Sequence, residues 1–119
     1  MKAMQIVSFD GPASGLRYQE APTPEPGPGE IAVDVDHAGV GYVEALFTEG
    51  LVPIDLPWTP GLEVTGRVRA LGVGVNGYRL GDAVVALTIT GGGGYGQVAV
   101  APAELVVPLP AGLDPILAA

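Results

Sequence analysis

Glycine and proline are spread along this sequence from one end to the other. There are 19 glycines and 12 prolines among 119 residues, and they follow no fixed period. Proline cannot donate a backbone hydrogen bond, and glycine supplies the backbone conformations that tight turns need. The lack of a period excludes a collagen-like repeat. The pattern therefore predicts a mainly β domain with short helices, in which many short strands and frequent turns form a compact, partly open barrel or sandwich.

The size and charge of the chain limit the other possibilities. Residues 1–119 are enough for one domain with a core, and a hydrophobic content of 48% argues against disorder. The net charge is −8 with five basic residues, so a nucleic-acid surface and a basic patch facing a membrane are not expected. No apolar run reaches the roughly 18 residues of a membrane helix, and the first residues resemble a strand rather than a signal peptide. We therefore expect a cytoplasmic protein with no membrane partner.

The residue types present also restrict the chemistry. Because cysteine is absent, disulfides, thiolate nucleophiles and cysteine-ligated metal sites are excluded. The single histidine, His37, is too few for a histidine-based zinc site. His37 continues the apolar face of Ile31, Val33 and Val35, which alternate with other residues as in a half-buried strand. It is interpreted either as a core histidine with a bonded ring nitrogen or as a functional residue near the strand end.

Local patterns divide the chain into expected elements. An extended, proline-rich connector is expected between the second and third strands, at residues 21–29. A turn at residues 11–15 separates the first two strands. The predicted strands are residues 2–9, 16–20, 31–38, 62–71, 83–88 and 97–101, with a last one near 105–107.

Two helices are predicted. Residues 42–49 form the first, with Val43, Leu46 and Phe47 on one face, Glu44 elsewhere, and Gly50 as its C-terminal cap. The second begins near residue 115, because Asp114 is a good N-cap and Pro115 suits the first helical position. Four residues after Pro115 cannot sustain an isolated helix. We expect that the chain is truncated within this helix; a natural short tail is the alternative.

Residues Gly72 to Gly77 match the GxGxxG pattern of dinucleotide-binding folds, but the match is predicted to be false. That motif works where a strand enters it and a helix begins within it. Here the next regular segment is the predicted strand 83–88, which leaves no room for a βαβ crossover. The glycines at 91–94 are likewise not a phosphate loop, because no Lys-Ser/Thr follows them, and a mobile loop or a bend is expected.

A set of motifs resembles the medium-chain dehydrogenase/reductase superfamily. Pro60-Gly61-Leu62-Glu63-Val64-Thr65-Gly66-Arg67-Val68, then Gly72-Val73-Gly74-Val75 and Gly81-Asp82-Ala83-Val84, follow its pattern PGxExxGxVxxxGxGV…GDxV. The connector, the Ala38-Gly39-Val40-Gly41 turn and the Gly94-Tyr95-Gly96 segment agree in order and spacing. The resemblance covers nearly the whole chain. It implies a GroES-like, partly open β-barrel, the catalytic domain that a Rossmann cofactor domain normally follows.

The resemblance is closest to the zinc-independent quinone oxidoreductase branch. Zinc members of the superfamily carry a Cys ligand at the position of Gly41 and a His ligand at that of Leu62, and neither side chain here can bind a metal. Members of the zinc-independent branch usually carry Asn at the Gly41 position, and often a Tyr near the cofactor at the position of Val52. No metal site is expected.

The resemblance implies a set of candidate site residues. Tyr42 and Glu44 are the candidate catalytic residues, and Gly41 with Tyr42 would approach the edge of the nicotinamide. Gly41, Tyr42 and Trp58 are the candidate substrate-binding residues. Tyr42 is interpreted either as a wall or donor of the site or as a tyrosine packed under the helix. Trp58 either lines an acceptor slot or anchors the core, and the carboxylate of Glu63 is expected to be buried and bonded to backbone.

The implied activity is hydride transfer from NADPH to quinones or α,β-unsaturated carbonyl compounds. NADPH would be bound mainly by a Rossmann domain outside residues 1–119, so this chain alone is expected to be inactive. A homodimer is one option for the assembly. Two alternatives remain: a free-standing GroES-like binding or assembly module without catalysis, and an enoyl-reductase remnant of a larger synthase.

Overall fold

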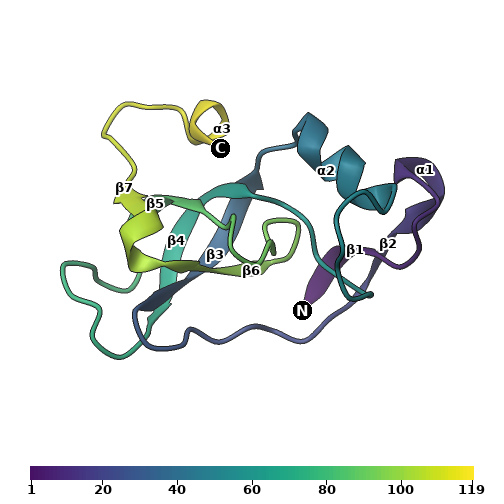
Figure 1. Ribbon diagram of the computed structural model, residues 1–119. Helices are drawn as coiled ribbons and strands as arrows, with labels where there is room; N and C mark the ends of the chain where they lie inside the picture. The colour runs from purple at the N-terminus through teal and green to yellow at the C-terminus, as the bar shows by residue number, and fades with distance from the viewer.

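The computed structural model describes all residues from 1 to 119, and strands dominate it (Figure 1). Two sheets are formed, both antiparallel: a hairpin of β1 and β2, and a five-stranded sheet in the order β6-β3-β4-β5-β7. The elements are β1 (Lys2–Ile6), α1 (Pro12–Gly15), β2 (Leu16–Glu20), β3 (Glu30–Ala38), α2 (Tyr42–Thr48), β4 (Glu63–Leu71), β5 (Ala83–Leu87), β6 (Val98–Pro102), the 3-10 helix η1 (Ala103–Leu105), β7 (Val106–Pro108) and α3 (Pro115–Ala118). The predicted mainly β class and partly open barrel are confirmed.

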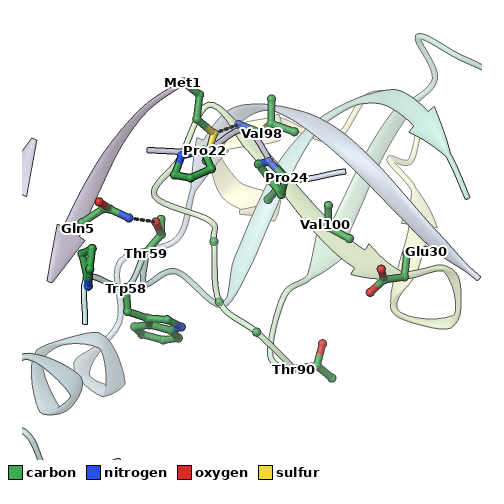
Figure 2. A pocket seen from close by; sticks show the side chains of 15 residues that line it. Met1, Gln5, Pro22, Pro24, Glu30, Trp58, Thr59, Thr90, Val98 and Val100 are labelled. Carbon is green, nitrogen blue, oxygen red and sulfur yellow. Dashed lines mark hydrogen bonds between the residues drawn. The ribbon is translucent and has the colours of Figure 1, made fainter. Parts of the chain in front are cut away.

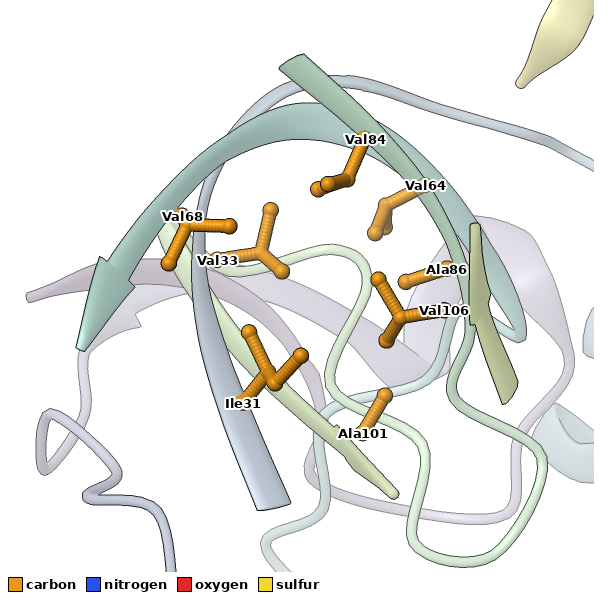
Figure 3. Packing of buried hydrophobic residues seen from close by; sticks show 8 residues of the cluster. All are labelled: Ile31, Val33, Val64, Val68, Val84, Ala86, Ala101 and Val106. Carbon is orange, nitrogen blue, oxygen red and sulfur yellow. The ribbon is translucent and has the colours of Figure 1, made fainter. Parts of the chain in front are cut away.

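Both edge strands of the larger sheet contribute to a single core, which shows that the sheet curls. Ala101 of β6 and Val106 of β7 belong to one cluster with Ile31, Val33, Val64, Val68, Val84 and Ala86 of the strands between them (Figure 3). Two register shifts, at Ala32/Val33 and Val35/His37, increase the local twist of β3 against β4. The edge strands β6 and β7 do not pair with each other, so the barrel stays open.

The segment with the GxGxxG pattern is a turn between β4 and β5, as predicted. Gly74 and Gly77 have positive φ angles of 85° and 87°, and no helix begins there. Gly72 lies against the connector, where an added Cβ would meet the Gly27 carbonyl oxygen at 1.9 Å. The Tyr78 hydroxyl then donates to the Val106 carbonyl at 2.7 Å. These glycines form turns and close backbone contacts, and Tyr78 anchors the loop to β7.

Several predicted boundaries and burial patterns were wrong. The first strand ends at Ile6 rather than at residue 9, and the predicted turn at 11–15 contains a short helix that begins at Pro12. The alternation in β3 fails at Ala32, which is buried together with Ile31 and Val33. β3 is a central strand with neighbours on both sides, and at Ala32 both of its faces are covered. His37 is half-buried at the open end of β3, so it is not a core histidine.

The remaining elements begin and end within about two residues of the predictions. The Asp114 Oδ1 atom accepts a hydrogen bond of 2.9 Å from the Ile116 amide, as expected of an N-cap. The Thr65 hydroxyl donates to the Pro115 carbonyl at 3.1 Å and attaches α3 to β4. The glycines at 91–94 form hydrogen-bonded turns, including Gly92 N–H to the Thr88 carbonyl at 2.8 Å. No helix in the structure combines the length and the apolar character needed to cross a bilayer.

Candidate functional site

The turn between β3 and α2 is held in place by a buried carboxylate. Glu44 is only 6% exposed, and its Oε2 atom accepts a hydrogen bond of 3.0 Å from the Gly41 amide. Gly41 precedes the first residue of α2 and Glu44 occupies the third position of that helix, so this contact is one half of a capping box. The Gly39 amide donates to the Glu63 carbonyl at 2.9 Å and ties the same turn to β4. Glu44 therefore positions the turn that contains Gly41.

Replacing Glu44 by alanine should loosen this turn. The buried acceptor is lost, and we expect the free energy of unfolding to fall by about 1–2 kcal/mol, because water can reach part of the freed Gly41 amide. Glu44→Gln keeps an acceptor oxygen and should lose less than half as much. Chemical denaturation measures the stability, and hydrogen exchange at the Gly41 amide measures the local effect. Equal stability of the alanine variant and the parent, with unchanged Gly41 exchange, would contradict this role of Glu44.

The predicted apolar face of α2 was wrong at Val43, whereas Leu46 and Phe47 are half-buried. Val43 is 46% exposed, whereas Glu44 and Thr48, one helical turn apart, are buried. Glu44 is turned inward by its bond to Gly41, and the Thr48 hydroxyl is satisfied by donating to the Ala45 carbonyl at 2.6 Å. The Phe47 ring contacts the Trp58 ring, with centroids 4.8 Å apart. The helix therefore packs Phe47 against Trp58 and also buries the polar groups of Glu44 and Thr48, whose burial is compensated by hydrogen bonds.

A small cavity lies behind the Gly41 turn. We call it the α2 cavity; its volume is about 100 Å³ and its lining residues are Pro12, Leu16, Val40, Gly41, Glu44, Ala45, Thr48, Pro60 and Tyr95. Burial, and secondly the charge of Glu44, raise the pKa of Tyr95 to about 12, so its phenol is a hydrogen-bond donor at neutral pH. Sequence reasoning overlooked Tyr95. In the sequence, Tyr95 is distinguished only by its position between Gly94 and Gly96, and this pattern indicates a turn rather than a functional site.

The other candidate residues are not gathered at this cavity. Tyr42 is 79% exposed and lines neither cavity described here, so the interpretation of a tyrosine packed under the helix was wrong. Glu63 is exposed, which contradicts the expected buried carboxylate. Glu63 is the first residue of β4. Its backbone carbonyl, rather than its carboxylate, makes the contact with the Gly41 turn. Val52 is exposed as well.

Trp58 lies in a second, larger cleft. This connector cleft has a volume of about 420 Å³, and Figure 2 shows Trp58 and Thr59 on one side of it, with Pro22 and Pro24 of the connector and Val98 of β6 around it. Its polar groups bind one another: Gln5 Nε2 donates to Thr59 Oγ1 at 3.2 Å. The Met1 sulfur accepts from the Val98 amide at 3.3 Å. Although larger, the connector cleft does not contain the Gly41 turn, so we place the candidate site at α2.

Neither a metal nor a dinucleotide fits the residues that the family patterns would assign to them. Gly41 and Leu62, at the positions of two zinc ligands, have no ligating side chain, and no group of three or more His, Asp or Glu side chains is placed to hold a metal ion. For a dinucleotide pyrophosphate, the backbone at Gly72 would have to be open. It is covered by the Gly27 and Glu30 carbonyl oxygens, which an added Cβ would meet at 1.9 and 2.9 Å. This turn therefore does not form a phosphate cradle.

Comparison with known proteins gives consistent results. Residues 27–111 match the model of the alcohol dehydrogenase GroES-like domain. The chloroplast envelope quinone oxidoreductase homolog of Arabidopsis thaliana is 34% identical over 115 residues, which is 92% of this chain and 35% of that protein. The quinone oxidoreductase of Sus scrofa is 33% identical over 117 residues, 96% of this chain and 35% of that protein. The chain thus spans about a third of the length of these curated relatives.

Solved structures show the same relationship. The human synaptic vesicle membrane protein VAT-1 homolog-like protein superimposes with a TM-score of 0.90 and 31% identity, over 97% of this chain and 37% of that chain. The quinone oxidoreductase of Escherichia coli, in complex with NADPH, gives a TM-score of 0.89 and 28% identity, over 99% of this chain and 36% of that chain. The match extends over nearly all of the structure described here.

Proposed function

The chain belongs to the family of alcohol dehydrogenase GroES-like domains, and from this premise we propose that it is the substrate-side catalytic domain of a zinc-independent, NADPH-dependent reductase of quinones or α,β-unsaturated carbonyl compounds. The observation that carries the proposal is the residue at position 41. Zinc-dependent members of the superfamily have a metal ligand at this position, whereas the glycine here has no side-chain donor atom. The names of the relatives, several of them quinone oxidoreductases, support the acceptor class. The NADPH-bound structure among the neighbours supports the cofactor.

We place the cofactor on a second, Rossmann-type domain rather than on residues 1–119. The relatives are about three times longer than this chain, and the strands described here are all antiparallel, with no βαβ unit among them. An exposed apolar surface supports such a partner domain: Val40 and Tyr42 at the start of α2, and Ile116 and Leu117 of α3, are each more than half exposed. In Figure 1, α2 and α3 lie along the same side of the molecule. We propose that the second domain packs over these side chains.

In this arrangement the chain contributes shape and hydrogen bonds. NADPH, when bound, supplies the hydride, and the acceptor needs no metal because the charge that develops delocalises onto its oxygen. The lack of a side chain at Gly41 leaves space for the Glu44 carboxylate, which an added Cβ would meet at 2.9 Å, and the exposed Tyr42 follows it as a wall or donor. Glu44 acts through the backbone, by positioning the Gly41 amide. These residues would orient the acceptor and exclude water.

A domain exchange tests the proposal. Residues 1–119 would replace the matching segment of the Escherichia coli quinone oxidoreductase, to which they superimpose over 99% of their length. We expect the chimera to oxidise NADPH with 1,4-benzoquinone or an enone, at a rate that changes less than about twofold when EDTA is added. The chain alone should show neither turnover nor fluorescence evidence of NADPH binding at micromolar concentration.

The control is the unmodified Escherichia coli enzyme, assayed in the same buffers. A chimera that folds and binds NADPH but reduces no quinone or enone would refute the proposed activity. Loss of activity in EDTA would refute the zinc-independent mechanism. Micromolar NADPH binding by residues 1–119 alone would refute the assignment of the cofactor to a second domain.

A further inference from the structure

The α2 cavity exists because the inward face of α2 carries small side chains. Gly41, Ala45 and Thr48 line it from the helix, where a core helix would normally direct large apolar side chains. The opposite wall consists of Pro12, Leu16 and Pro60. The space that remains beside the helix has a volume of about 100 Å³. Val40, one of its lining residues, is exposed, so solvent and small ligands can reach the cavity.

One end of this apolar cavity is polar. Glu44 and Tyr95 both line it, and the charge of the Glu44 carboxylate acts on the Tyr95 phenol. The Glu44 Oε2 atom accepts from the Gly41 amide, which leaves further acceptor capacity on the carboxylate. Tyr95 supplies a phenolic hydroxyl. A ligand hydroxyl at this end could donate to Glu44 and accept from Tyr95, whereas a carbonyl oxygen could use only Tyr95 and would face the negative charge.

We propose that the α2 cavity is a binding site for a small phenolic ring, whose hydroxyl bonds to Glu44 and Tyr95 and whose ring lies against Ala45, Leu16 and Pro60. The volume of about 100 Å³ limits the ligand to a single small ring, since a larger apolar cavity of about 150 Å³ engineered in another protein binds one benzene. The hydroquinones formed by quinone reduction belong to the same class, so in that respect the inference deepens the proposed function and rests on it.

The test is titration of residues 1–119 with phenol, followed by two-dimensional NMR of the backbone amides. We expect a dissociation constant of about 1 mM, ordinary for a ligand of seven heavy atoms, with shifts concentrated at Gly41, Ala45 and Tyr95. Benzene, which lacks the hydroxyl, should bind about tenfold more weakly, because a hydrogen bond to a charged group is lost. No NADPH is present, so a negative result here leaves the chimera assay of the proposed function unaffected, and the reverse also holds.

Amino-acid substitutions test whether phenol binds in the α2 cavity. Tyr95→Phe keeps the ring and removes one hydroxyl, and it should weaken phenol binding threefold to tenfold without changing benzene binding. The matched control Tyr18→Phe removes a hydroxyl from an exposed tyrosine of β2 and should leave the affinity unchanged. Ala45→Leu should fill the cavity and abolish binding; if that variant does not fold, the smaller Ala45→Val should still weaken binding at least threefold.

Three results would overturn the assignment. One is the absence of any shift at 20 mM phenol. Another is equal affinity for phenol and benzene, since the hydroxyl would then not be recognised. The third is binding that a folded Ala45 variant leaves unchanged, because the ligand would then lie elsewhere on the chain.

Discussion

Replacing Gly66 by alanine is expected to destabilise this domain by about 3 kcal/mol or more, a large fraction of the stability of a domain of this size. Gly66 lies in β4 opposite Val35 of β3. A Cβ atom added there would lie 2.0 Å from the Asp34 carbonyl oxygen and 2.9 Å from a methyl group of Val33. The nearest obstacle is backbone of the neighbouring central strand, so the two strands must separate to admit a methyl group.

Urea denaturation of the purified chain measures this effect. Gly91→Ala is the matched control: Gly91 is exposed, its φ angle is outside the left-handed region, and an added Cβ would meet nothing within 4 Å. We expect the control to change the free energy of unfolding by less than about 0.5 kcal/mol. If Gly66→Ala were as stable as Gly91→Ala, the close approach of β3 and β4 described here would be incorrect.

Truncation of Ile31 to alanine is expected to have a similar effect for the opposite reason, because it leaves a cavity instead of a clash. Ile31 is fully buried in β3 and belongs to the cluster that also contains Ala101 and Val106, from the two edge strands. Buried isoleucine-to-alanine changes cost about 2–5 kcal/mol. The upper half of that range is expected here, since the curled sheet surrounds Ile31 from several strands and cannot easily collapse.

The control for Ile31 is Val107→Ala on β7, where the side chain is 55% exposed and points away from the core. Its effect should stay below about 1 kcal/mol. Thermal unfolding followed by circular dichroism, together with urea denaturation, compares the two variants. A loss below 1 kcal/mol for Ile31→Ala would contradict a single core shared by both edges of the sheet.

Much of the fold could be predicted from local patterns. Short segments between glycines and prolines located the strands, and the Asp114-Pro115 pair located the start of α3. The false dinucleotide match could also be rejected from the sequence, because a strand follows the glycines at once. These inferences succeed because they depend on neighbours within a few residues along the chain.

The site could be predicted only in part. Gly41 and Glu44 were selected by their place in a family pattern, and the structure brings them together through one hydrogen bond. Tyr42 was selected because it follows the Gly41 turn, and Trp58 as a wall of an acceptor slot, but neither residue lines the α2 cavity. The roles predicted for Tyr42 and Trp58 stay predictions.

The amino-acid sequence by itself determined the class of this protein: a mainly β domain punctuated by glycine and proline, with motifs whose spacing identifies its family. Tertiary structure alone decided which face of α2 is buried, because the apolar periodicity favoured Val43 while the hydrogen bonds of Glu44 and Thr48 turned the helix the other way. It also decided that Gly66 must lack a side chain, and that Tyr95 meets Glu44 beside a cavity. For Gly66 and Tyr95 the physical reason is that the contacts join residues distant in sequence and depend on how whole strands approach. For α2 the hydrogen bonds span only three residues, but an apolar periodicity does not register buried polar side chains, and which side faces the protein depends on packing against it.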